Sequence, residues 1–263
     1  MLPYNLHSHT IRCGHAVGED EEYVLAAIKA GFKELGFSDH VFLPGVYEPK
    51  VRGDFSCLED YIRSVNALKE KYKDQIKIYL GFEAEWCGER FRSYYRDLLD
   101  KYGFDYLILG QHSYAEGNKM THYYWQGPED GPRNYIRSLL EGMESGLFTY
   151  VAHPDIYVYW CRAWNELAIS IAEAIASTSK RLNIPLEVNC GWRTRLEEIK
   201  QPDCLVYPSN PFWEVISKYG CPVVIGIDAH DPLDYQTTQY DFYEEFCKKH
   251  NLNLLTERPA FQK

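Results

Sequence analysis

The sequence has few basic residues for a chain of its length. It contains 28 lysines and arginines against 38 aspartates and glutamates, which gives a formal net charge of -10. A protein that binds nucleic acid needs a basic face, because contacts to the phosphate backbone supply much of the affinity. The composition therefore argues against a nucleic-acid partner. A small phosphorylated substrate would have to be held by metal ions and a few local arginines.

The sequence also lacks a run of about 18 apolar residues, the length that a membrane-spanning helix needs. Its first residues do not combine a basic stretch with an apolar one, as a secretion signal does. We therefore expect a soluble, cytoplasmic protein without a membrane partner. The oligomeric state does not follow from the sequence.

No two cysteines have the Cys-x-x-Cys spacing of a structural zinc site or a redox motif. The eight cysteines are scattered singly, at positions 13, 57, 87, 161, 190, 204, 221 and 247. We expect these thiols to be reduced and mostly buried, as is usual in a cytosolic chain. Cys13 lies near His15, but a thiolate would bind a catalytic metal more tightly than hydrolysis usually requires. We therefore expect that Cys13 is not a ligand.

Seven short apolar segments alternate with amphipathic helical segments along the 263 residues. Unbroken apolar strands between such helices are typical of a parallel sheet with both faces covered. With 45% hydrophobic residues, the chain can bury a full core as one domain spanning residues 1–263. A long loop over residues 113–132, rich in Tyr, Trp, Gly and Pro, is expected above the site. We expect strands near residues 4–6, 33–38, 76–85, 106–109, 149–152, 185–189 and 223–227.

Six of these seven expected strands end in histidine, glutamate or aspartate. His7 and His9 lie two residues apart at the end of the first strand, so they point to the same side and could hold one divalent metal. Structural histidines have no reason to favour one end of every strand, whereas barrels of this kind carry their active sites there. The pattern predicts a (β/α)7-like barrel with a polynuclear metal site, and an open doubly wound sheet is the alternative architecture. The other strand ends carry His40, Glu83 or Glu85, His112, His153, Asp228 and His230.

Together these motifs resemble the complete motif set of the PHP family of metal-dependent phosphoesterases, spread over nearly the whole chain. The resemblance implies a distorted seven-stranded barrel, related to the TIM barrel, that holds three divalent metal ions. Two shorter stretches resemble the histidinol-phosphatase branch of the family, Leu186-Glu187-Val188-Asn189-x-Gly191-x-Arg193 and Tyr207-Pro208-Ser209. The family motifs are His7-x-His9, His15, Ser38-Asp39-His40, Gly81-x-Glu83, His112, His153 and Asp228-x-His230.

The resemblance implies three ligand sets. Imidazole and carboxylate donors suit zinc, manganese or iron better than magnesium alone. Two metals that share a hydroxide make a nucleophile from water, and Glu83 is the candidate bridge between them. We expect substitution of Glu83 to matter far more than substitution of Glu85. Asp228 could transfer the proton that the water loses. The implied sets are His7, His9, Glu83 and Asp228; Glu83, His112 and His153; and His15, His40 and His230.

Arg193 is the best candidate to hold a phosphate, because a guanidinium matches two phosphate oxygens and the residue follows a strand end. Arg162 and Arg195 are further candidates. The predicted reaction is hydrolysis of a small phosphate monoester, L-histidinol phosphate, to L-histidinol and phosphate in histidine biosynthesis. The alternatives are a related phosphoesterase acting on nucleotides or nucleic acid ends, an amidohydrolase-like barrel, and a catalytically silent metal-binding or regulatory module.

Overall fold

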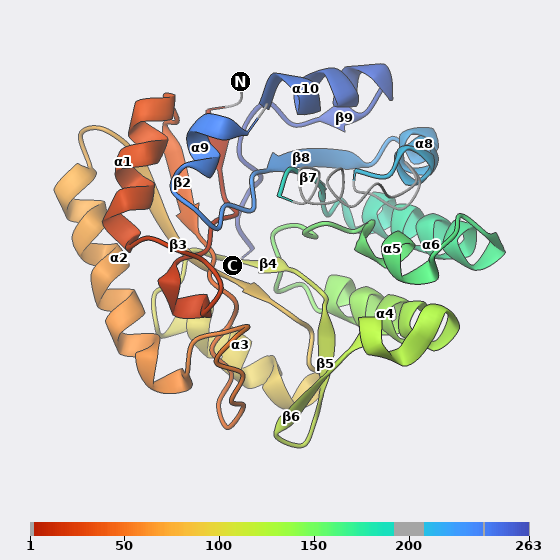
Figure 1. Ribbon diagram of the computed structural model, residues 1–263, viewed down its shortest axis with the longest axis horizontal. Coiled ribbons are helices and arrows are strands. Elements are labelled where there is room, and N and C mark those ends of the chain that lie inside the picture. Colours follow the sequence, from red (N-terminus) through yellow and green to blue (C-terminus); the bar gives the residue numbers. More distant parts are fainter. Residues whose placement is uncertain (1–2, 192–207, 239, 263) are drawn as a thin grey trace.

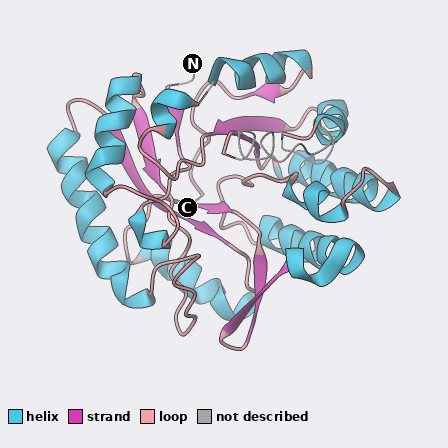
Figure 2. Cartoon of the chain, viewed as in Figure 1, coloured by secondary structure: helices cyan, strands magenta, loops and turns pink. Residues whose placement is uncertain are grey.

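Parallel strands run through the centre of the molecule and helices surround them (Figure 1; Figure 2). The computed structural model describes residues 3–191, 208–238 and 240–262. β1 pairs with β2, β2 with β3, β3 with β4, and β7 with β8, all in parallel. These strands are β1 (Tyr4–Asn5), β2 (Glu34–Phe37), β3 (Lys77–Ala84), β4 (Tyr106–Leu109), β7 (Leu186–Asn189) and β8 (Pro222–Gly226).

Two sets of backbone contacts close these strands into a barrel. Val151 forms parallel bridges to residues of both β4 and β7, so it takes the place of the strand expected over residues 149–152. Ser8, which follows β1, bridges in parallel to Ala229, which follows β8. Seven strand positions therefore complete the circuit, and the predicted distorted (β/α)7 barrel is confirmed. The expected fifth strand is reduced to one bridged residue.

Helices follow the strands and cover the outside of the barrel (Figure 2). Local sequence sets their ends: Glu19 and Glu22 cap the start of α1 reciprocally, and Gly31 ends it at φ 93°. Among the described residues, no helix is both long and apolar enough to cross a membrane. The α-helices are α1 (Asp20–Ala30), α2 (Leu58–Tyr72), α3 (Arg92–Asp100), α4 (Gly127–Glu144), α5 (Ile156–Cys161), α6 (Glu166–Leu182), α8 (Asn210–Tyr219), α9 (Asp234–Thr237) and α10 (Tyr240–Lys249). Further short elements are the 3-10 turns η1 (Ile11–Cys13), η2 (Phe55–Cys57), η3 (Glu89–Phe91) and η4 (Tyr123–Gln126), and strand β9 (Asn253–Leu254).

The prediction of a long loop over residues 113–132 is wrong. A hairpin of β5 (Ser113–Glu116) and β6 (Lys119–His122) occupies its first half, followed by η4 and the start of α4. Pro128 and Pro132 lie within the first two turns of α4. A proline is tolerated near a helix start because the first N–H groups have no partner inside the helix. This accounts for Pro128, whereas Pro132 lies inside the helix, so neither proline marks a loop.

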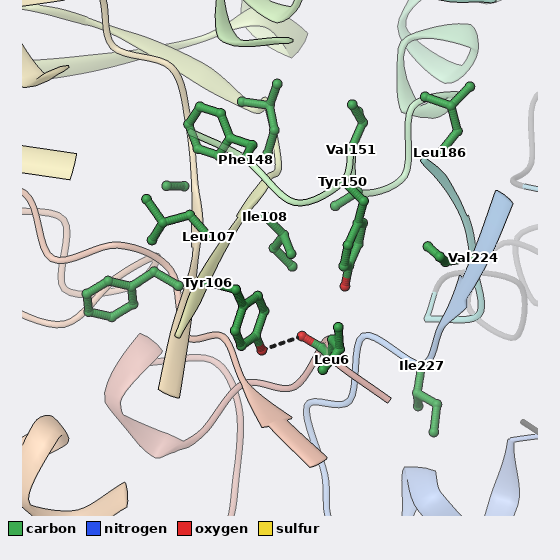
Figure 3. Packing of buried hydrophobic residues seen from close by; sticks show 14 of the residues in the cluster. Leu6, Tyr106, Leu107, Ile108, Phe148, Tyr150, Val151, Leu186, Val224 and Ile227 are labelled. Atoms are coloured by element: carbon green, nitrogen blue, oxygen red, sulfur yellow. Dashed lines mark hydrogen bonds between the residues drawn. The ribbon is translucent and has the colours of Figure 1, made fainter. Parts of the chain in front are cut away.

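The amino end of the barrel is filled by Tyr106, the first residue of β4. A Cβ atom at Gly36 or Gly81 would lie 2.2 or 2.4 Å from atoms of the Tyr106 side chain, so both positions need glycine. The Tyr106 hydroxyl donates to the carbonyl oxygen of Leu6 at 2.7 Å (Figure 3). Phe261 stacks on the Tyr106 ring, with ring centroids 5.1 Å apart. This end is closed by packed side chains, which leaves the carboxyl end for the polar residues.

Candidate metal centre

The carboxyl ends of the barrel strands bring all nine predicted metal ligands into one cluster. The ring centroid of His9 lies 4.4 Å from that of His40 and 4.3 Å from that of His230. On the other side of the cluster, the rings of His112 and His153 are 4.7 Å apart. Most of these side chains are buried. The nine residues are His7, His9, His15, His40, Glu83, His112, His153, Asp228 and His230.

The ligands form one continuous cluster in which several three-residue sets have ligand atoms within 4.8 Å of one another. One of these three-residue groups lies within a single predicted metal site, and two combine residues from different predicted metal sites. The division into three separate metal sites therefore stays a prediction. The set within a predicted site is His7, His9 and Glu83, and the crossing sets are His7, His153 and Asp228, and His9, His40 and His230.

Glu83 lies between two groups of imidazoles, and each of its oxygens faces one group. Oε1 lies 2.8 Å from His153 Nε2. Oε2 lies 3.0 Å from His40 Nδ1 and 3.4 Å from His9 Nε2. Burial opposes ionisation of this carboxyl, but the imidazoles, His40 foremost, hold the pKa of Glu83 well below its usual value. A Cβ atom at Gly110 would lie 1.9 Å from Oε1, so a glycine is required beside this carboxylate.

Asp228 contributes the second carboxylate of the centre. Its Oδ1 lies 3.1 Å from His9 Nε2 and 3.3 Å from His7 Nε2. Although burial opposes ionisation, these imidazoles hold the pKa of Asp228 well below its usual value. The backbone of Asp228 has φ 56° and that of His153 has φ 31°, a region that residues with a side chain rarely adopt. Strained backbone of this kind concentrates at functional sites, which agrees with the place of both residues.

Several ring nitrogens of the cluster are buried without a hydrogen-bond partner among the residues that the structure describes. They are His7 Nε2, His9 Nδ1, His9 Nε2 and His40 Nδ1. Burial and the rings of His230 and His40 lower the pKa of His9 well below its usual value, and burial with the same neighbours lowers that of His15 to about 4. Burial opposes protonation of His7 and of His153 as well, but nearby carboxylates raise the pKa of both. Buried polar atoms without partners are costly. Metal ions bind imidazoles through an unprotonated ring nitrogen beside ionised carboxylates, and the close grouping of both donor types fits such ions.

Glu187 in β7 is a functional candidate that sequence reasoning missed. Its Oε1 accepts a hydrogen bond from His7 Nδ1 at 2.8 Å, and its Oε2 accepts from the backbone N–H of His153 at 3.0 Å. A carboxylate on Nδ1 fixes the tautomer and leaves Nε2 of His7 for a metal. A Cβ atom at Gly226 would lie 1.8 Å from Glu187 Oε1. The available signal was an acid inside the apolar strand Leu186–Asn189.

The surroundings of Glu85 contradict the expectation from the sequence that its substitution would matter little. The side chain is fully buried and forms a two-point pair with Arg52, at 2.9 and 3.0 Å. Arg52 is also buried, and removing one partner of such a pair leaves an uncompensated charge in the interior. Substitution of Glu85 is therefore expected to be severe.

Cys13 lies within 4.8 Å of ligand nitrogens of His15 and His230. Burial raises the pKa of its thiol to about 12, which favours the neutral form over a thiolate ligand. The described cysteines are free thiols and most of them are buried, in agreement with the sequence prediction.

The predicted phosphate-binding arginines are not part of the described cluster. Arg162 follows α5 in the left-handed conformation, with φ 56°, and its side chain is exposed. Burial raises the pKa of the Tyr159 hydroxyl, and the positive charge of Arg162 opposes this shift. Arg193 and Arg195 lie outside the described residues.

Comparison with known proteins places this geometry in a family. The family model described as the PHP domain matches residues 5–191. The chain belongs to the PHP domain family. The PHP chain is 27% identical over 234 residues to a "Probable histidinol-phosphatase" of Deinococcus radiodurans, which covers 86% of this chain and 85% of that protein. It is 29% identical over 199 residues to the "Histidinol-phosphatase" of Lactococcus lactis subsp. lactis, which covers 70% of each.

A solved structure shares the fold of this PHP protein. It is histidinol phosphate phosphatase from Lactococcus lactis subsp. lactis, complexed with zinc, L-histidinol and phosphate. The TM-score is 0.71 at 18% sequence identity, and the match covers 96% of this chain and 95% of that chain. The fold is thus the distorted TIM barrel of PHP phosphatases, and the protein is a phosphoric monoester hydrolase.

Proposed function

We propose that this PHP phosphatase hydrolyses L-histidinol phosphate to L-histidinol and phosphate, a reaction of histidine biosynthesis, with three divalent metal ions. The observation that carries the proposal is Glu83, whose two oxygens face two separate groups of imidazoles at 2.8 and 3.0 Å. A carboxylate so placed can join two cations. The histidinol-phosphatase relatives, and the L-histidinol and phosphate in the similar structure, support the substrate.

The proposed ligand sets follow the family motifs, and zinc, manganese or iron suits their donors. The zinc in the similar structure supports a metal of this kind. We also propose that residues 1–263 form one catalytic domain. The bridge between Ser8, after β1, and Ala229, after β8, joins the first and last strands of one barrel. The sets are His7, His9, Glu83 and Asp228; Glu83, His112 and His153; and His15, His40 and His230.

The side chains have distinct proposed roles. When bound, the cations supply a nucleophilic water at neutral pH and neutralise the phosphate. Glu83 and His153 would hold the ions, and burial excludes bulk water from both side chains. Asp228 would accept the proton that the water loses and pass it to the leaving oxygen. Arg193, with Arg195, would bind phosphate oxygens, and the exposed Arg162 would take part only from the edge of the site.

The test combines metal analysis with phosphate release from a panel of esters. The purified protein should carry about three transition-metal equivalents, and chelation should abolish activity. Among L-histidinol phosphate, nucleoside monophosphates and p-nitrophenyl phosphate, the first should have the highest kcat/KM. At most one metal equivalent in a fully loaded sample would refute the trinuclear centre, and a preference for nucleotides would refute the substrate alone.

Arg193→Ala tests the binding of phosphate separately from the metals. The variant should lower kcat/KM by about 2–4 kcal/mol of transition-state stabilisation, the size of one preorganised charged contact. Metal content should stay unchanged. Arg193→Lys should recover only part of the loss, because an ammonium keeps the charge without the two-point geometry. Parent activity in Arg193→Ala would remove this residue from the site.

A further inference from the structure

A buried carboxylate lies beside His112, on the opposite ring nitrogen from the one that faces Glu83. His112 Nε2 is 3.8 Å from Glu83 Oε1, and His112 Nδ1 is 3.6 Å from Glu85 Oε1. We infer that Glu85 is a positioning residue that holds the proton of His112 on Nδ1 and directs Nε2 toward the metal centre. The inference rests on the proposed metal function, because a metal needs one defined, unprotonated ring nitrogen.

Glu85 is itself held in a fixed position. Both of its oxygens pair with the guanidinium of Arg52, which also donates to the carbonyl oxygen of Val41 at 3.1 Å. The hydroxyl of Ser113 donates to Glu85 Oε1 at 3.4 Å. The Glu85 and Arg52 side chains are at most 1% exposed. A carboxylate that is fixed on three sides can orient a neighbouring ring, whereas a mobile one cannot.

A related arrangement, with a shorter contact, occurs on the other side of the centre. His7 Nδ1 lies 2.8 Å from the buried carboxylate of Glu187, and His7 Nε2 faces Asp228 at 3.3 Å. In both cases Nδ1 faces a carboxylate outside the ligand cluster and Nε2 faces a carboxylate inside it. Such outer carboxylates raise the affinity of metal sites about 10- to 100-fold. The repetition at two histidines on different strands indicates that Glu85 acts on His112 as Glu187 acts on His7.

Glu48 provides a matched control, because it pairs with the same guanidinium without facing a predicted ligand. Glu48 Oε2 accepts from Arg52 Nε at 2.9 Å, and Glu48 Oε1 lies 3.3 Å from His122 Nε2. Glu48 and Glu85 therefore both neutralise Arg52, but only Glu85 reaches His112. Glu85 makes two contacts with Arg52 and Glu48 makes one. A purely structural role would therefore show as a larger loss of thermal stability in the Glu85 variant without a separate loss of zinc affinity.

The first experiment compares Glu85→Gln with Glu48→Gln in the full chain by competition of zinc binding against a chelator. The midpoint temperature of thermal unfolding should be lower in both variants than in the parent. Glu85→Gln should weaken the affinity for at least one zinc equivalent by about 10- to 100-fold, while Glu48→Gln should stay within about threefold of the parent. Equal zinc affinities in the two variants would overturn the inference and leave the proposed function intact. A parent that binds no zinc, manganese or iron would overturn both.

A second variant covers the case in which Glu85→Gln does not fold. Glu85→Asp keeps the charge that Arg52 needs but withdraws the oxygens from His112 by one methylene. In the metal-free, ¹⁵N-histidine-labelled protein, long-range proton–nitrogen spectra report which ring nitrogen carries the proton, and His112→Gln identifies the signal. The parent and Glu48→Gln should carry it on Nδ1 of His112, and Glu85→Asp should show a mixture. A proton on Nε2 in the parent would overturn the inference.

Discussion

The two ends of the barrel bury polar groups in opposite ways. At the amino end, the hydroxyl of Tyr106 lies 2.7 Å from the carbonyl oxygen of Leu6 and 3.0 Å from that of Phe37. At the carboxyl end, both ring nitrogens of His9 and one of His40 are buried without a hydrogen-bond partner in the part of the chain that the structure describes. An unsatisfied buried polar atom costs about 1–3 kcal/mol. The carboxyl end thus gives up stability for sites that a metal ion can occupy.

Glycine serves both ends, with different consequences. Gly81 gives room to the ring of Tyr106, since a Cβ atom would lie 2.4 Å from it. Gly110 gives room to the carboxylate of Glu83, since a Cβ atom would lie 1.9 Å from Oε1. The first close approach serves packing and the second positions a reactive group. Substitutions at the two ends should therefore separate stability from activity.

The largest effect on activity is expected for Glu83→Gln. An amide cannot join two cations as a carboxylate does, so kcat/KM should fall by at least about 10³-fold. The metal content measured by elemental analysis should fall with it. The side chain keeps its size, so circular dichroism should show a folded protein. Activity within about tenfold of the parent would mean that another acid joins the metals.

A smaller but large loss is expected for Gly110→Ala. The added methyl group would displace the carboxylate of Glu83, and a misplacement of about 1 Å costs about 10²-fold in rate. Gly142→Ala in α4 is the matched control, because its methyl group would meet the apolar side chain of Leu109 at 2.8 Å. Steady-state kinetics and thermal unfolding distinguish the two. Gly142→Ala should lose stability while kcat/KM stays near that of the parent, and an equal loss of kcat/KM in both would contradict the role of Gly110.

Substitution of His15 is expected to have a moderate effect on how the free energy of unfolding depends on pH. Partial desolvation and the rings of His40 and His230 lower the pKa of His15 from 6.5 to about 4. Between these values the unfolded chain binds a proton at His15 that the folded protein does not, so the free energy of unfolding falls as the pH falls from 6.5 and levels off near 4. Urea unfolding of chelated samples should show a smaller fall in His15→Gln than in the parent. Parallel curves would contradict the lowered pKa.

The strands and the ligand cluster could be predicted because each signal is local. An apolar strand followed by His or Asp, as at His153 and Asp228, is enough to predict that this residue lies at the carboxyl end of a barrel. The hairpin and helix start within residues 113–132 could not be predicted from their composition. Pro128 and Pro132 suggested a loop, although Pro128 lies at the start of α4 and Pro132 inside it.

The outer carboxylates escaped prediction because their partners are distant in sequence. Glu187 and His7 are 180 residues apart, and Glu85 and Arg52 are 33 residues apart. An acid at the end of an apolar strand has the same local signal as Glu83, whichever neighbour it meets. The closed barrel decides which acid faces the centre and which acid supports a ligand.

The smallest effect on activity is expected for Tyr106→Phe at the amino end. The variant keeps the ring that fills the barrel but removes the hydroxyl that donates to the carbonyl oxygen of Leu6. The free energy of unfolding should fall by about 1–3 kcal/mol, because that carbonyl is buried and loses its donor. Urea unfolding should give the same loss with and without metal, and kcat/KM should stay within about twofold, since the ring that packs inside the barrel is retained and no predicted ligand loses a contact. A fall in kcat/KM without a loss of stability would show that the amino end controls the metal centre, and the contrast between the two ends would fail.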